Sequence, residues 1–154
     1  MTVDTPRPGL TVLASKLGPQ ETAARLVAAL TARGMTVISR VNHAAGAAAV
    51  GMVLRPTELI VFGNPLVGTP LMQAVQTTGI DLPLRALVWQ DEAGATWLGY
   101  IAPGWIAECH GIAGELDATI EKMAQALLVV SRQAAGHDPD DASASAAQSD
   151  AGHL

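Results

Sequence analysis

The side chains that could bind or transform a ligand gather in a few turn-forming stretches. Asn64 and Thr69 lie in "FGNPLVGTPLM", which follows an apolar run directly and contains two glycines and two prolines. Asp81 lies in "GIDLPLR", and His43 follows an alternating segment. Amide, carboxylate and imidazole groups at the ends of strands often meet around a ligand on a rigid scaffold. We therefore expect these four residues to form a ligand site.

The same stretches indicate the kind of ligand. Thr69 as N-cap and Pro70 as the first helical residue predict a helix start, whose free backbone N–H groups can hold an anion. His43 can change charge near neutral pH. The residues thus favour a small anionic or carbonyl ligand. In the alternative interpretation these residues only cap turns, and Asp81 pairs with Arg85.

An enzyme is a second possibility, with His43 as the acid/base and Asp81 as its orienting carboxylate. A structural or partner-binding module is a third. Cys109 and His110 are neighbours, and neighbouring side chains on a helix diverge by about 100°, so they are poor ligands for one metal. His43, Cys109 and His110 form a zinc or copper set only if the fold brings them together. We predict no metal site and assign no cofactor.

Periodicity predicts an α+β single domain, with a mostly antiparallel sheet packed by helices and a long C-terminal helix. The run 58–63 is continuous and apolar, as in a strand buried on both faces. In the segment 36–42 the alternation places Val37 and Val41 on one side. The expected strands are 10–15, 36–42, 58–63, 85–90 and 95–101, and the expected helices are 18–34 and the one that contains Leu116 to Val130.

Composition divides the chain into a flexible arm (1–9), a domain (10–136) and a disordered acidic tail (137–154). All nine Lys and Arg and ten of the fourteen acids precede the tail, so the body carries about −1 (nine minus ten). This near-neutral body lacks the basic patch that nucleic acids need and the basic face of a membrane-surface helix. One cysteine and an N-terminus without an apolar core favour the cytoplasm.

Three stretches together, "NHAAGAAAVGMVLRPTELIVFGNPLVGTPLM", "IDLPLRALVWQDEAGATWLGYIAP" and "AECHGI", resemble the DUF302 family, a domain of unknown function. The resemblance implies a small α+β domain, often dimeric, without an established reaction or catalytic residues. Many members have a cysteine before Asn-Pro, where this chain has Gly63, so thiol chemistry is not expected at that turn. We expect a homodimer that covers apolar surface. The positions that the resemblance groups together are His43, Arg55, Asn64, Thr69, Asp81 and His110.

Overall fold

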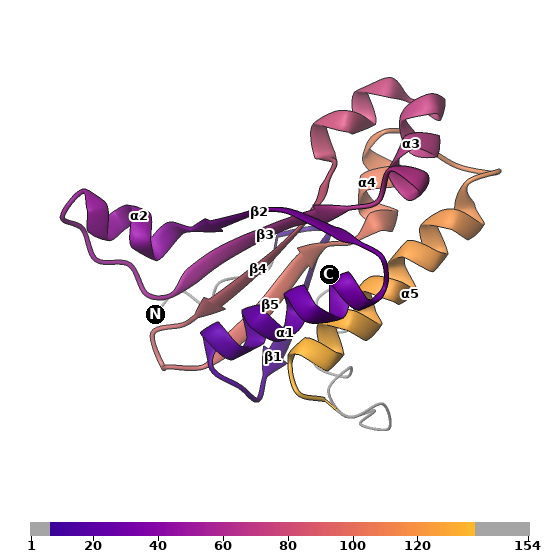
Figure 1. The fold of residues 1–154 in the computed structure, drawn as a ribbon. Helices are drawn as coiled ribbons and strands as arrows, with labels where there is room; N and C mark the ends of the chain where they lie inside the picture. Colours follow the sequence, from indigo (N-terminus) through magenta and orange to yellow (C-terminus); the bar gives the residue numbers. More distant parts are fainter. Residues whose placement is uncertain (1–6, 138–154) are drawn as a thin grey trace, which may run out of the picture.

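Five antiparallel strands form one sheet, in the order β1-β5-β4-β3-β2 (Figure 1). The computed structural model describes residues 7–137. The α+β class and the antiparallel sheet are therefore confirmed. The strands are β1 (Leu10–Ser15), β2 (Thr36–Asn42), β3 (Thr57–Gly63), β4 (Leu84–Gln90) and β5 (Thr96–Ile101).

Two long helices, α1 (Pro19–Ala32) and α5 (Asp117–Ala134), lie side by side along the sheet (Figure 1). Leu26 of α1 and Leu127 of α5 belong to one core with the inward side chains of the sheet. Burying one such leucine contributes about 1.5–3 kcal/mol, so these helices fix one face of the sheet. The shorter helices are α2 (His43–Ala49), α3 (Pro65–Ala74), the 3-10 helix η1 (Gln76–Asp81) and α4 (Pro103–Cys109).

Only one face of β3 is fully buried. Ile60 and Phe62 lie in the core, whereas Leu59 and Val61 point to the opposite face and stay partly exposed. Directly opposite partners share a face, so Leu59 lies beside Leu87 of β4 on this open face. The prediction that segment 58–63 is buried on both faces is therefore wrong for the single chain.

The hairpin of β4 and β5 is confirmed, and its turn is held by Asp91. The carboxylate accepts hydrogen bonds from the Trp97 indole N–H at 2.8 Å and from the Ala95 backbone N–H at 2.9 Å. These two bonds lower the pKa of Asp91, because they stabilise the ionised carboxylate. On the open face Trp89 lies directly opposite Trp97, so both indoles belong to that face.

A β-bulge in β2 changes which side chains face together. The pairing with β3 shifts between Val37 and Ser39, so Val37 lies opposite Phe62 and Val41 lies opposite Leu59. Phe62 and Leu59 point to opposite faces of β3. The prediction that Val37 and Val41 share one side is therefore wrong, because the extra residue of the bulge reverses the alternation.

Gly9 and His137, near the two ends of the described segment, both form hydrogen bonds with the domain. Gly9 accepts the Ala102 N–H at 2.8 Å, and the His137 ring N–H donates to the Ala14 carbonyl at 2.7 Å. Gly9 belongs to the predicted arm (1–9) and His137 to the predicted tail (137–154), yet both contact the domain. The rest of those two predicted segments, 1–6 and 138–154, lies outside the described residues.

Candidate functional site

The end of β3 and the start of β4 lie side by side at one end of the sheet. Phe62 pairs with Leu84, so Asn64 and the residues just before Leu84 leave the sheet side by side. The chain between them forms α3 and η1, which stand over this end (Figure 1). The antiparallel register thus brings Asn64, Thr69 and Asp81 to the same end of the molecule.

Asn64, and not Thr69, caps the helix that follows β3. The Asn64 Oδ1 accepts the Leu66 N–H at 2.9 Å, and Pro65 is the first helical residue. Thr69 is exposed in the middle of α3, and Pro70 lies inside the helix. The expected start at Thr69-Pro70 is therefore five residues too late, since Asn64-Pro65 offers the same cap-then-proline signal five residues earlier.

The first N–H groups of α3 already have partners. Asn64 accepts the Leu66 N–H through its side chain and the N–H groups of Val67 and Gly68 through its carbonyl, at 2.9 and 3.0 Å. Pro65 has no N–H to offer. An anion at this helix start would have to displace Asn64, so the expected anion site at the N-terminus of this helix is not supported.

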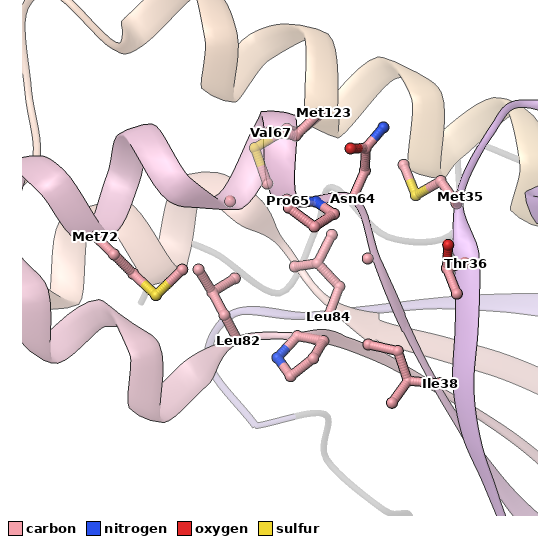
Figure 2. Close-up of a pocket in the computed structure, with 13 residues that line it drawn as sticks. Met35, Thr36, Ile38, Asn64, Pro65, Val67, Met72, Leu82, Leu84 and Met123 are labelled. Carbon is pink, nitrogen blue, oxygen red and sulfur yellow. The ribbon is translucent and has the colours of Figure 1, made fainter.

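An apolar pocket of about 330 Å³ lies between this helix and the start of β2 (Figure 2). Three methionines line it, Met35 before β2, Met72 from α3 and Met123 from α5. Unbranched thioether side chains adapt to ligands of irregular shape. Leu82 and Leu84 form the wall next to Asp81.

Two polar side chains line this pocket, Thr36 and Asn64, and the Asn64 amide has unused donors. Its Oδ1 must face the Leu66 N–H, which leaves the NH₂ group as a donor. Among residues 7–137 this NH₂ group makes no hydrogen bond within the chain. Asn64 thus offers a hydrogen bond to a carbonyl oxygen at the edge of an apolar space.

His43 lies at the opposite end of the sheet from Asn64. Asn42 pairs with Glu58, whereas Thr36 pairs with Gly63, so the length of β2, roughly 20 Å, separates the two residues. His43 is exposed at the start of α2, which projects from the body (Figure 1). Arg55 precedes β3 and lies at this same far end. The predicted convergence of His43 with Asn64 and Asp81 is therefore wrong in its geometry.

Asp81 pairs with His110 across 29 residues of sequence. The His110 Nε2 lies 2.6 Å from the Asp81 Oδ2, with the His110 side chain 14% and the Asp81 side chain 37% exposed. The contact joins the end of η1 to the residue after α4. The alternatives that paired Asp81 with Arg85 or with His43 do not hold, because the fold supplies a different partner. Only the family resemblance had grouped His110 with Asp81.

Metal-binding side chains do not gather in the described part of the chain. Across residues 7–137, no three His, Cys, Asp or Glu side chains are close enough to hold one ion. Cys109 is exposed.

Residues 7–137 contain no helix of the length and apolarity that a membrane span requires.

A family model described as "Domain of unknown function DUF302" matches residues 11–129. A solved structure of an uncharacterized conserved DUF302 protein from Bacillus stearothermophilus has the same fold. The TM-score is 0.74 at 18% identity, over 82% of this chain and 98% of that chain. At this identity the likeness concerns the fold alone.

Curated relatives carry a different kind of name. "Fluoride-specific ion channel FluC 1" of Brucella suis biovar 1 (strain 1330) is 44% identical over 128 residues, 83% of this chain and 50% of that protein. "Fluoride-specific ion channel FluC 2" of Brucella melitensis biotype 1 is also 44% identical over 128 residues, 47% of that protein. The chain therefore spans about half the length of the curated relatives it matches.

The Asp81–His110 contact predicts a measurable coupling energy. We expect Asp81→Asn and His110→Gln each to lower the free energy of unfolding by about 1 kcal/mol, because each leaves a half-buried partner unmatched. The double variant should lose little more, which gives a coupling of about 1 kcal/mol in urea unfolding.

The exposed Glu21–Arg25 pair on α1 is the matched control, with its charged atoms 3.2 Å apart. Pairs of this kind contribute only about 0.3–0.5 kcal/mol. A coupling for Asp81 and His110 no larger than for the control pair would show that the contact does not hold η1 to α4.

Proposed function

This chain belongs to the DUF302 family, and from that premise we propose that it is a small-ligand-binding domain that works as a homodimer. The ligand would be an apolar molecule with a carbonyl group. The single cysteine supports a cytoplasmic location for the protein.

The pocket beside α3 is the observation that carries the ligand proposal. Small-molecule sites are concave, mostly apolar spaces of about 300–1,000 Å³ with a few convergent polar groups. This pocket has about 330 Å³ of space, and Asn64 lies on its lining. A carbonyl oxygen would accept from the Asn64 NH₂ group, while Met35, Met72 and Met123 would pack around the apolar body.

The open face of the sheet supports the homodimer. The β3 sequence has the continuous apolar character of a strand buried on both faces, yet Leu59 and Val61 are only partly buried in one chain. Trp89, Trp97 and Leu87 share this face. A second copy packed face to face would bury the second side of β3.

Exposed apolar residues in the segment that follows α2 would add to this surface. Val50, Met52, Val53 and Leu54 follow α2, and Val53 is fully exposed. Strand spacing and rise give the five-stranded face a flat footprint of about 480 Å². A standard interface takes about 800 Å² from each partner, counted as accessible surface. The proposed dimer therefore also needs area from the exposed side chains that follow α2.

An enzyme built on His43 and Asp81 is not part of this proposal, because the two residues lie at opposite ends of the sheet. A module that only binds a partner protein would leave the pocket beside α3 without a role.

The ligand proposal predicts that filling the pocket weakens binding. A Cβ at Gly68 would lie 3.6 Å from the Leu82 Cδ1 and 4.0 Å from the Met72 Cε, which is ordinary contact, so Gly68→Leu should fold. The new side chain would occupy the ligand's space. We expect at least about a tenfold weaker affinity for acetophenone, an apolar carbonyl compound, by titration calorimetry.

Gly46→Leu is the control, since a Cβ at Gly46 in α2 meets nothing within 4 Å. Native mass spectrometry of the purified chain would show any retained ligand, which Gly68→Leu should lose. Acetophenone binding that is equal in both variants would exclude this pocket as the site.

The homodimer predicts that a charge on the open face separates the subunits. Val41 of β2 and Val129 of α5 are similarly exposed, at 39% and 42%, but only Val41 lies on the open face. We expect Val41→Lys to raise the dimer dissociation constant at least about tenfold, because burying an unpaired charge is costly. Light scattering at micromolar concentration should show a dimer for the wild type and for Val129→Lys. A monomeric wild type would contradict the proposal.

The names of the curated relatives support a second proposal, a role beside a fluoride channel. The 44% identity extends over 83% of this chain, although those proteins are about twice as long. On this proposal, cells that lose the chain should grow poorly in sodium fluoride and normally in sodium chloride, and re-expression should restore growth. Equal growth in both salts would remove the proposal.

A further inference from the structure

A second pocket, of about 240 Å³, lies beside the same segment that leads into β4. Leu84 lines both pockets, which are therefore neighbours. The second pocket differs in its charged lining, since Arg7, Asp81 and Arg85 all contribute to it.

The two arginines give this pocket unused positive charge. Within residues 7–137 neither the Arg7 nor the Arg85 guanidinium makes an ion pair or a hydrogen bond. The one lining carboxylate, Asp81, is already held by His110 at 2.6 Å. Two arginines without a partner among residues 7–137 therefore line a cavity whose one acid contacts His110, which favours an anionic ligand.

The remaining walls are apolar, and one of them is fixed by a glycine. Gly9 has a φ of +83°, and a Cβ at this position would overlap the Trp105 ring. Only glycine allows the chain to pass so close, so the ring is held beside the pocket. The rest of the lining consists of Leu84, Ile101, Ile106 and Cys109. The cavity thus combines an anion-binding end with a surface for an apolar or planar group.

We propose that this pocket is a separate binding site for a small carboxylate with an apolar or aromatic body. Arg7 and Arg85 would hold the carboxylate, because a guanidinium presents paired N–H donors that match two carboxylate oxygens. The body would pack against Trp105 and Ile101. The site is independent of the carbonyl-binding proposal, which concerns the first pocket. Arg85 lies opposite Val61 on the open face, so the proposed dimer must leave this end of the face uncovered.

The test uses the full chain and benzoate, with benzamide as the neutral molecule of the same shape. We expect benzoate to bind and to shift the Trp105 indole N–H resonance, and benzamide to bind at least about tenfold more weakly. Arg85→Gln and Arg7→Gln should each weaken benzoate binding by about ten- to a hundredfold, as for a lost hydrogen bond between charged groups. Arg33→Gln, at the exposed end of α1, should leave it unchanged.

Several results would overturn the proposal. Equal binding of benzamide would remove the role of charge, and an equal loss in Arg33→Gln would show non-specific attraction. No benzoate binding at roughly 10 mM would exclude a useful site. Arginine-dependent binding of sodium fluoride without benzoate binding would exclude the apolar body. A strong loss in Gly68→Leu would place benzoate in the first pocket, whereas unchanged binding in that variant supports two sites.

Discussion

The antiparallel pairing of β3 with β4 is the constraint on which the candidate sites depend. In this pairing the chain must leave β3 and enter β4 at the same end of the sheet, because Phe62 lies opposite Leu84. Residues 64–83 connect the two strands outside the sheet and form α3 and η1 at that end. Both pockets form where this excursion meets the sheet, and they share Leu84. Because β2 is also antiparallel to β3, His43, which follows the end of β2, lies at the other end of the sheet.

Local patterns were sufficient to predict much of this fold. The strands 10–15 and 36–42, the hairpin around Asp91 and the last helix have strong periodicity and turn signals, and they occur within a few residues of the expected bounds. The helix start after β3 was harder, because Asn64-Pro65 and Thr69-Pro70 carry the same signal. The choice between them depends on how soon after the end of β3 the chain can begin a helix, and that is set by the fold.

Other features could not be predicted because they depend on contacts between distant residues. The bulge between Val37 and Ser39 is set by pairing with β3 and has no clear signal in "TVISRVN". The Asp81–His110 contact joins two short helices whose approach follows from the packing of α4 against α5 and η1. Of the four residues expected to form one site, Asn64, Thr69 and Asp81 do lie at one end of the sheet. Of these, Asn64 lines the first pocket and Asp81 the second.

The two pockets divide between them the ligand chemistry that the sequence had assigned to one place. At the start of α3 the backbone donors are used by Asn64, so what remains there is one neutral amide donor in an apolar space. Such a donor suits a carbonyl oxygen, because a carboxylate in that space would lose its hydration without a compensating charge. In the second pocket Arg7 and Arg85 supply that charge, and the Asp81 Oδ2 contacts His110 and neither arginine. The His110 side chain therefore bears on the anion pocket through Asp81, although it does not line that pocket itself.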